Sequence, residues 1–300
     1  MKVGFLGTGL MGLAMAQRLL EANVDIVAYN RTPAKLEPLR KAGAAIASHP
    51  HEVISACNCV ILMLTDTSAI RSLLLCDSSR QQLVGRTVIQ MGTIAPTDSR
   101  AIRDEVIAAG GDYLEAPVLG SIPEAKAGKL IVMVGGSTEQ FQHWSGLLQR
   151  LGSEPLLIGA VGAAAAVKLA LNQLITSLTA AFGLSLSFLQ HQGIDIHLFM
   201  QILRDSTLYA PTFDKKLQRM LDRNFSHPNF PTKHLMKDTD LFIAEANSAS
   251  LNVSGIEGVR RILEMALDRG LGEDDYSSLY SVINPEEPLA DRKQNSPRSS

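Results

Sequence analysis

The chain has 300 residues, of which 46% are hydrophobic and 19% are charged, and its formal net charge is −2. This length and composition suffice for two domains and exclude global disorder. The near-neutral charge provides no basic surface for nucleic acid, so that class of partner is not expected. Cys57, Cys59 and Cys76 have neither a metal-ligand spacing nor a disulfide pattern, and we interpret Cys57 and Cys59 as small core residues.

The first residues combine an apolar strand pattern, a glycine-rich turn and a helical pattern. In this context G-x-G-x-x-G predicts a dinucleotide site. Gly7 permits the tight turn, Gly9 lets the backbone approach a pyrophosphate, and Gly12 lets the helix and strand pack closely. The pyrophosphate is expected on the amides at the positive end of the helix. The predicted cofactor-binding residues of this turn are Gly7, Thr8, Gly9, Leu10, Met11 and Gly12.

The second strand pattern ends in Asn30-Arg31-Thr32. In NAD-binding folds an acidic residue near this point holds the ribose 2′-hydroxyl, but here an amide, a guanidinium and a hydroxyl follow the strand. A guanidinium can make a bidentate pair with a 2′-phosphate. The pattern therefore favours NADP(H) over NAD(H). The alternative is that Arg31 is an ordinary exposed arginine at the start of a helix.

Alternating strand and helix patterns predict a doubly wound, mainly parallel sheet of the Rossmann type. After Gly162 the strand patterns stop and long helical patterns follow. We predict a dinucleotide-binding domain over residues 1–161, an all-α substrate and oligomerisation domain with a long interdomain helix over residues 162–284, and a disordered tail over residues 285–300. The expected strands are 2–6, 25–29, 59–64, 87–90, 112–115, 129–134 and 154–158, and the expected helices are 33–42, 50–56, 97–109, 138–150, 163–190, 198–204, 232–248 and 254–268.

Lys168 is the only Asp, Glu, Lys or Arg residue between Glu154 and Asp195. Burying an ammonium in so apolar a stretch is costly, so a compensating role is expected. Asn172 follows four residues later and lies on the same helical face. The alternative is a lysine whose stem covers apolar surface while its ammonium reaches water.

The uncharged stretch from Leu169 to Leu189 is long enough to cross a bilayer. Seven Ser, Thr, Asn and Gln residues are spread through it, however, and it has no aromatic belt. We therefore favour a helix that is buried between domains or subunits. At about 1.5 Å per residue the helical pattern from Ala163 to Gln190 would extend roughly 40 Å, so we expect a homodimer or homotetramer.

Four blocks in order resemble the β-hydroxyacid dehydrogenases, a family that includes 3-hydroxyisobutyrate dehydrogenases and NADPH-dependent glyoxylate/succinic semialdehyde reductases. The blocks are FLGTGLMG, EAPVLGSIPEAKAG, GAVGAAAAVKLALN and FPTKHLMKDTDL, and the resemblance extends from residue 1 to about residue 284. It implies that Lys168 is the catalytic lysine and Asn172 its partner. An ammonium near a carbonyl oxygen would stabilise developing negative charge and deliver a proton, and apolar surroundings would lower the pKa of the lysine.

The resemblance also implies roles for further residues. Met63, Leu64, Thr93 and Lys237 are expected near the cofactor. Gly120 and Ser121 are expected to hold a substrate carboxylate through backbone amides and a hydroxyl, as anion-binding turns do. Asp238 is expected to hydrogen-bond within the site and Phe230 to form one of its walls. For each of these residues the alternative is a charge on a helix surface or an aromatic side chain in the core.

Two positions depart from the family pattern. Leu119 stands where the family usually has a serine, which removes a hydrogen bond worth roughly 0.5–1.5 kcal/mol and makes the pocket more apolar. Ala164 stands where the family often has a second glycine before the lysine, which mainly restricts the backbone.

These features predict an NADPH-dependent reductase of small aldehydes or keto acids, with no catalytic metal and no membrane or nucleic-acid partner. The alternative within the family is an NAD(P)-dependent 3-hydroxyisobutyrate dehydrogenase or a dehydrogenase of a related 3-hydroxy acid. A hypothesis of another class is a non-catalytic NADP-binding module, since a fold does not fix a function. Because the sequence enters a strand at once, leaving no room for a signal peptide, we expect a cytoplasmic protein.

Overall fold

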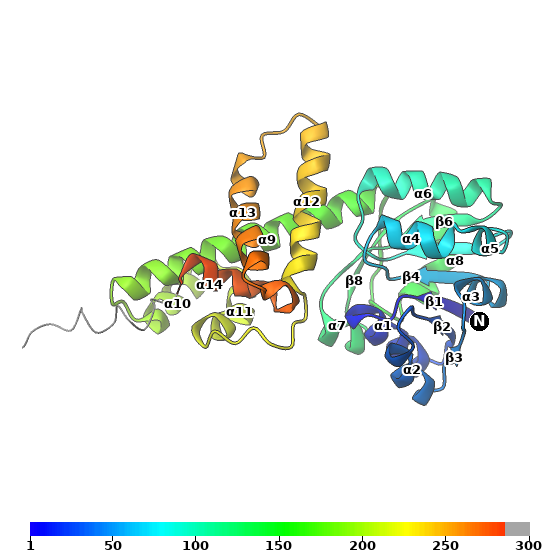
Figure 1. Ribbon diagram of the computed structural model, residues 1–300, viewed down its shortest axis with the longest axis horizontal. Coiled ribbons are helices and arrows are strands. Elements are labelled where there is room, and N and C mark those ends of the chain that lie inside the picture. Colours follow the sequence, from blue (N-terminus) through cyan, green and yellow to red (C-terminus); the bar gives the residue numbers. More distant parts are fainter. Residues whose placement is uncertain (286–300) are drawn as a thin grey trace, which may run out of the picture. The chain divides into compact units, whose positions relative to one another are not determined.

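The computed structural model describes residues 1–285, and it divides the chain into two compact units, Met1–Leu171 and the residues from Asn172 onward (Figure 1). The tail that we predict to be disordered begins at residue 285, and its residues from 286 on lie outside the described part of the chain. The predicted fold class is confirmed: a mostly parallel sheet with helices is followed by a helical region.

The first unit is built on one sheet in the order β3-β2-β1-β4-β5-β6-β8-β7, with β9 beside β8. Strands β1 to β6 run parallel to one another, whereas β8 runs antiparallel to both β6 and β7. The order 3-2-1-4-5-6 is that of a dinucleotide-binding sheet, with its switch point between β1 and β4. The strands are β1 (Lys2–Leu6), β2 (Asp25–Tyr29), β3 (Ala45–Ile46), β4 (Cys59–Leu62), β5 (Thr87–Gln90), β6 (Asp112–Glu115), β7 (Val118–Leu119), β8 (Ile131–Gly135) and β9 (Leu156–Gly159).

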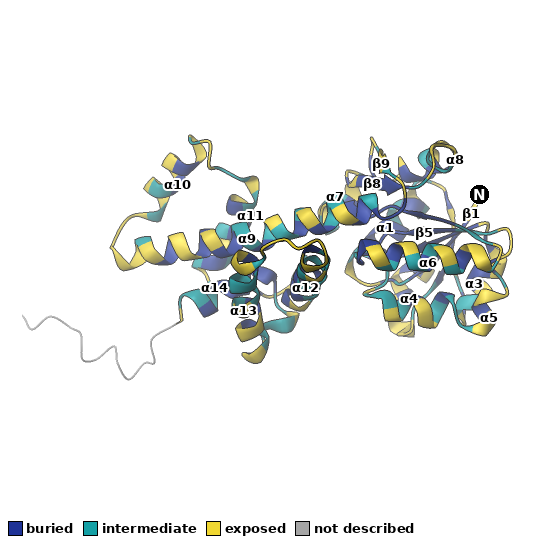
Figure 2. Cartoon of the chain, turned by 90° about the horizontal axis from the view of Figure 1, so that it is seen from above, coloured by how far each residue is buried: buried dark blue, intermediate teal, exposed yellow. Residues whose placement is uncertain are grey.

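Helices cover both faces of this sheet because alternate strand residues are apolar on both sides. In β1, Val3 and Phe5 belong to one buried cluster and Leu6 to the other. Figure 2 shows buried strands such as β5 together with helices such as α6 that expose one face. The helices of this unit are α1 (Leu10–Glu21), α2 (Glu37–Lys41), α3 (Pro50–Ala56), α4 (Thr67–Leu74), α5 (Asp77–Arg80), α6 (Pro96–Ala108), α7 (Ile122–Ala127) and α8 (Thr138–Leu148), with a 3₁₀ turn at Pro33–Leu36.

The second unit is entirely helical within the described residues. Its core forms around α9 (Ala163–His191), which begins in the first unit and continues into the second. Phe182 and Leu186 of α9 pack in one apolar cluster, and Ala180 packs in another. The other helices are α10 (Ile196–Arg204), α11 (Pro211–Leu221), α12 (Thr232–Ser248), α13 (Ser254–Asp268) and α14 (Leu279–Ile283), with 3₁₀ turns at Leu271–Glu273 and Tyr276–Ser278.

Helix α9 is long and apolar enough, by length and composition, to cross a membrane, and 44% of its most apolar window is buried in the protein. The buried residues include the polar side chains Asn172, Thr176, Thr179 and Ser187. Three of these hydroxyls donate to the carbonyl four residues earlier, at 2.7–3.0 Å. This pattern is typical of the core helix of a folded domain, since the polar groups are satisfied where the helix is packed.

Several element bounds differ from those expected. The strand expected over 59–64 ends at Leu62, and the segment expected to be one helix over 33–42 is a 3₁₀ turn followed by α2. Pro38 occupies the second position of α2, where a missing N–H costs nothing, and this favours a new helix start. The short elements β3, β7, α4, α5, α7 and α14, and the longer helix α11, were not predicted.

Candidate active site

The glycine-rich turn after β1 has the geometry that the sequence predicts. Gly7 has a φ of +96°, which favours glycine, and a Cβ at this position would lie 2.4 Å from the carbonyl oxygen of Met63. A Cβ at Gly12 would lie 2.1 Å from the carbonyl oxygen of Gly7. In contrast, a Cβ at Gly9 would meet nothing within 4 Å. Two glycines therefore allow close packing, and the third faces open space.

The amides at the start of α1 suit an anion. Gly9 is the N-cap, no side chain caps the helix, and its first turn has no acidic residue. The first N–H groups of a helix have no intrahelical partner, and together with the helix dipole they attract phosphate. This arrangement fits the pyrophosphate of a dinucleotide.

The other predicted cofactor residues follow neighbouring parallel strands, so they lie at the same edge of the sheet. Asn30 follows β2, and its amide donates to the Thr8 hydroxyl at 2.7 Å while its Oδ1 accepts from the Thr32 N–H at 3.1 Å. Asn30 thus links the glycine turn to the segment that carries Arg31, whose side chain is exposed. This is the segment at which the sequence predicts contact with the 2′-phosphate of a cofactor.

Met63 and Leu64 follow β4, and Thr93 follows β5. The Met63 N–H donates to the Leu6 carbonyl at 2.9 Å, which holds it beside the end of β1. A Cβ at Gly92 would lie 2.6 Å from the Leu64 carbonyl oxygen, so the segment leading to Thr93 passes close to Leu64. The structure thus gathers these residues around the switch point of the sheet, where ligands bind in such folds.

Gly120 and Ser121, expected to bind a substrate carboxylate, lie at the start of α7. Gly120 has a φ of +134°. The N–H and the hydroxyl of Ser121 both donate to the Glu124 carboxylate, at 2.8 and 2.5 Å, and form a capping box. The two donors that the prediction assigns to Ser121 are therefore used by Glu124, and a substrate carboxylate would have to displace Glu124 to reach them.

Lys168 and Asn172 lie one turn apart on α9, as the sequence spacing predicts. The Asn172 side chain is 2% exposed, and its Nδ2 donates to Asp238 Oδ2 at 2.6 Å. Because Nδ2 must face the carboxylate, Oδ1 is fixed as an acceptor, and it has no hydrogen-bond partner within residues 1–285. A buried acceptor left open in this way suits a hydroxyl or ammonium donor.

Lys237, predicted near the cofactor, lies in the second unit on α12. Its ammonium forms an ion pair with Asp238 Oδ1 at 2.7 Å, so Asn172, Lys237 and Asp238 form one connected group. The Asp238 carboxylate is buried and contacts an amide on one oxygen and an ammonium on the other. It therefore fixes the orientation of Asn172 on the helix that carries Lys168.

Phe230, the predicted wall residue, packs edge-on against Tyr276 with 5.8 Å between ring centroids. The segment that leads to it is held at both ends, because the Asp275 N–H donates to the Phe225 carbonyl and the Tyr276 N–H to the Phe230 carbonyl, at 2.9 and 3.1 Å. Sequence reasoning missed this support.

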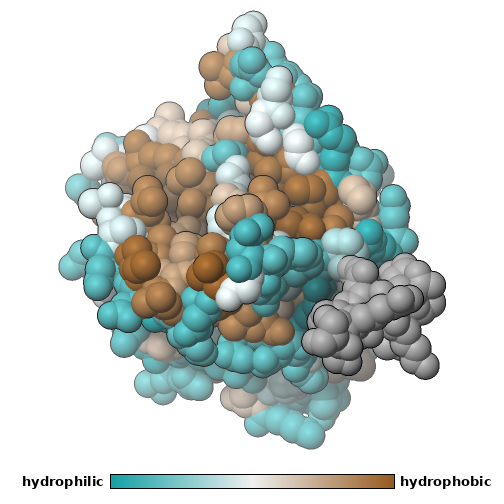
Figure 3. All heavy atoms as spheres, turned by 90° about the vertical axis from the view of Figure 1, so that its left-hand side faces the viewer, coloured by the Kyte–Doolittle hydropathy of each residue, from teal (hydrophilic) through white to brown (hydrophobic). Residues whose placement is uncertain are grey.

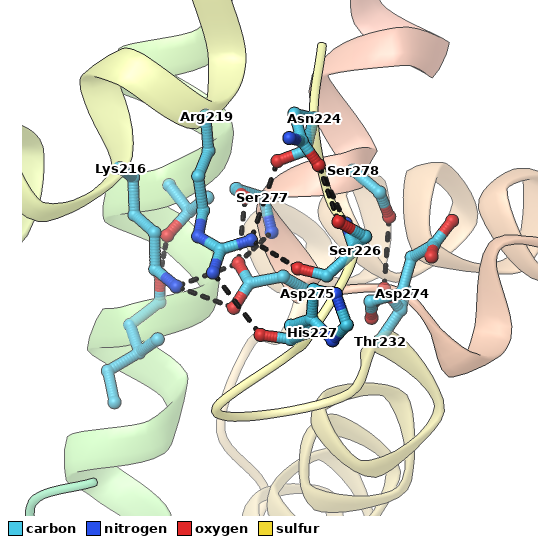
Figure 4. A network of polar contacts seen from close by, with 12 residues as sticks. Lys216, Arg219, Asn224, Ser226, His227, Thr232, Asp274, Asp275, Ser277 and Ser278 are labelled. Carbon is cyan, nitrogen blue, oxygen red and sulfur yellow. Dashed lines mark hydrogen bonds and ion pairs between the residues drawn. The ribbon is translucent and has the colours of Figure 1, made fainter. Parts of the chain in front are cut away.

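A buried ion pair anchors the same segment. Figure 4 shows the Lys216 ammonium facing the Asp275 carboxylate, at 2.7 and 2.8 Å from its two oxygens. Burial lowers the pKa of Lys216, and the neighbouring Asp275 opposes that shift. Arg219 adds hydrogen bonds to the carbonyls of Asn224, Ser226 and His227. A lysine in an amphipathic helix pattern gives no sign of such a role, so only the structure identifies it.

No group of three or more His, Cys, Asp and Glu side chains within residues 1–285 could hold a metal ion.

Residues 2–162 match the family model described as the NAD-binding domain of 6-phosphogluconate dehydrogenase, and residues 162–283 match the model described as NAD-binding of NADP-dependent 3-hydroxyisobutyrate dehydrogenase. Glyoxylate/succinic semialdehyde reductase 1 of Arabidopsis thaliana is 30% identical over 285 residues, which cover 94% of this chain and 98% of that protein.

Two further proteins are similar to this chain, one in sequence and one in fold. The cytokine-like nuclear factor N-PAC of Gallus gallus is 28% identical over 93% of this chain and 51% of its own length. The crystal structure of a 3-hydroxyisobutyrate dehydrogenase from Salmonella typhimurium superposes with a TM-score of 0.84 at 22% identity, covering 94% of this chain and 99% of that one. The latter similarity concerns the fold.

Proposed function

The chain belongs to the β-hydroxyacid dehydrogenase family of NAD(P)-dependent oxidoreductases, and we propose that it reduces a small aldehyde or keto acid, such as glyoxylate or succinic semialdehyde, with NADPH. The observation that carries this proposal is the position of Lys168 on α9 one turn before Asn172, whose buried Oδ1 is an open acceptor and whose Nδ2 donates to Asp238. The name of the plant relative supports the choice of substrate class.

The lysine and the amide have separate tasks in this proposal. The Lys168 ammonium stabilises the negative charge that develops on the carbonyl oxygen and gives that oxygen its proton. Asn172 accepts a hydrogen bond through Oδ1, from either the lysine or a hydroxyl of the ligand. This bond limits how the lysine ammonium and the ligand can be arranged relative to each other. The nicotinamide supplies the hydride when it is bound.

We propose NADPH rather than NADH as the reductant because the strand end that usually carries an acidic residue carries Asn30 and Arg31 here. Asn30 is fixed to Thr8, so the exposed Arg31 stands next to the glycine turn. Variants of Arg31 distinguish the two cofactors.

We also propose that copies of the chain associate. Large apolar side chains are exposed on α9 and α10, in i, i+4 pairs on each helix: Leu184 with Phe188, and Leu198 with Ile202. Figure 3 shows apolar residues gathered on the side of the molecule that carries α10. Contiguous exposed apolar surface of this kind is typical of protein interfaces.

The test is NADPH oxidation, followed by absorbance, against glyoxylate, succinic semialdehyde, methylmalonate semialdehyde and tartronate semialdehyde. We expect turnover on at least one of them, and Lys168→Ala should lower kcat by about a thousandfold or more while NADPH affinity stays nearly unchanged. Leu119 lies within the predicted substrate-binding segment, so Leu119→Ser should favour the substrates of the reductase branch. Unchanged turnover in Lys168→Ala would remove the lysine from the mechanism.

A non-catalytic NADP-binding module is the second candidate, because a relative named as a nuclear factor is 28% identical over 93% of the chain. The same panel distinguishes the two. The oxidation of 3-hydroxyisobutyrate with NADP⁺ is assayed as well. Tight NADPH binding without turnover of any compound in either direction would favour the non-catalytic module.

A further inference from the structure

A buried carboxylate outside the predicted site contacts the helix that carries the predicted catalytic lysine. Glu115 is the last residue of β6 and is only 1% exposed. Its Oε1 accepts hydrogen bonds from the Gly162 N–H at 2.8 Å and from the Ala165 N–H at 3.0 Å. Gly162 follows Glu115 by 47 residues and directly precedes α9, and Ala165 lies in the first turn of that helix.

This contact replaces a cap that α9 cannot supply itself. Gly162 precedes the helix and has no side chain, so it cannot accept a bond from the amide three residues on. A capping box normally satisfies the amides of the N-cap residue and of the third helical residue with two different side chains. Here a single carboxylate oxygen from a strand serves both amides, and its negative charge also faces the positive end of the helix dipole.

The carboxylate is itself held in place. The Ser99 hydroxyl of α6 donates to Oε2, and the Tyr113 hydroxyl lies 2.9 Å from Ser99 Oγ. Ser99 and Tyr113 are buried. A Cβ at Gly135 of β8 would lie 2.5 Å from Oε1, so only glycine leaves room for this arrangement. Three elements of the sheet domain thus fix one carboxylate against one helix end.

Lys168 follows Ala165 by three residues and lies in the next turn of α9. The helix backbone is rigid over so short a distance, so whatever fixes the first turn also fixes the origin of the lysine side chain. Misplacing a catalytic group by about 1 Å can cost about a hundredfold in rate. We propose that Glu115 is a positioning residue for Lys168 and acts through the first turn of α9; this inference rests on the proposed function.

Two substitutions at Glu115 separate positioning from general damage. In Glu115→Ala both amides lose their acceptor, and we expect kcat on the best panel substrate to fall about tenfold to a hundredfold. The KM for that substrate and the Kd for NADPH should stay within about threefold of wild type, because the Glu115 carboxylate bonds to Ser99, Gly162 and Ala165 and not to the predicted substrate donors of Gly120 and Ser121 or to the glycine turn. Glu115→Gln should restore most of kcat, since its amide oxygen can accept the same two bonds.

A second readout does not depend on activity. Amide hydrogen–deuterium exchange over residues 159–172 should speed up in Glu115→Ala and stay near wild type in Glu115→Gln. If Glu115→Ala does not fold, Ser99→Ala provides the test, and it should lower kcat about threefold with a smaller rise in exchange. The proposal is overturned if the Ala variants keep wild-type kcat and exchange, if kcat falls without any change in exchange, or if NADPH affinity falls in proportion to kcat.

The wild-type protein separates this proposal from the proposed function. If wild type turns over no panel compound, the proposed function fails, and exchange alone then decides the role of Glu115. Unchanged exchange in folded Glu115→Ala would overturn the positioning role in that case as well.

Discussion

Arg31 is the residue on which the cofactor preference depends. Its guanidinium is exposed beside Asn30, which is fixed to Thr8 of the glycine turn. Replacing Arg31 with Ala removes the proposed bidentate partner of the 2′-phosphate, so the Kd for NADPH should rise about tenfold to a hundredfold while the Kd for NADH changes little. Fluorescence titration with both cofactors measures this. Arg31→Lys is the matched control and should lose only part of the affinity, because the positive charge remains but the planar guanidinium that makes two parallel hydrogen bonds is lost. Equal losses for both cofactors would contradict the assignment.

His234 gives the second unit a dependence on pH. Burial on α12 lowers the pKa of its imidazole, and the neighbouring Lys233 and Lys237 lower it further. The folded pKa is below the unfolded value of 6.5, so between the two the unfolded chain binds a proton that the folded chain lacks. Stability is therefore lost as pH falls from 6.5 through the folded pKa.

We expect the urea midpoint to drop between about pH 7.5 and about pH 5.5, and to drop less in His234→Asn. His197→Asn, a substitution at an exposed position on α10, is the control and should behave like wild type. An equal drop in wild type and in His234→Asn would exclude this histidine as the source.

At the scale of elements, two substitutions in the glycine turn can separate an effect on cofactor binding from an effect on the stability of the fold. A Cβ at Gly9 would have no neighbouring atom within 4 Å, whereas a Cβ at Gly12 would lie 2.1 Å from the carbonyl oxygen of Gly7. Gly9→Ala should therefore lower NADPH affinity by about tenfold or more, with less than about 1 kcal/mol lost in the free energy of unfolding. Gly12→Ala should cost about 3 kcal/mol, because the clashing atom belongs to the backbone.

Urea denaturation without cofactor and NADPH titration on the folded fraction measure the two effects. A Gly9→Ala protein that binds NADPH like wild type would show that the pyrophosphate does not approach this turn.

Elements with a strong periodic pattern could be predicted from the sequence, and α3, α12 and α13 have the expected bounds. The two-residue strands β3 and β7 are too short for any period to appear, and they form only because neighbouring strands offer unpaired backbone groups. Helix α11 was missed although Phe213, Leu217 and Met220 repeat at helical spacing.

The cofactor turn could be predicted because its residues are consecutive and each glycine has a local task. The support of the lysine helix could not, since Glu115 and Gly162 are 47 residues apart and a carboxylate at a strand end does not indicate its partner. The same holds for Asn172 and Asp238, which the resemblance placed in one site but whose hydrogen bond spans 66 residues. Long-range polar contacts depend on packing that no local pattern reports.

At the scale of the whole molecule, the exposed apolar residues of α9 and α10 predict association. Phe188 and Ile202 are 62% and 64% exposed, and each has an apolar neighbour four residues before it on the same helical face. Burying such side chains stabilises an interface by about 1.5–3 kcal/mol each, and introducing a charge there leaves it unpaired in the interface. Light scattering should therefore give wild type a mass of two or four chains of 32.4 kDa.

The double variant Phe188→Asp, Ile202→Asp should shift that mass towards one chain, because each aspartate would have to be buried without a partner. Val84→Asp is the matched control: Val84 is 69% exposed but lies in the first unit, so the mass should not change. A wild-type monomer at the concentrations used for activity would contradict the association. An oligomer that the double variant leaves intact would place the interface on another surface.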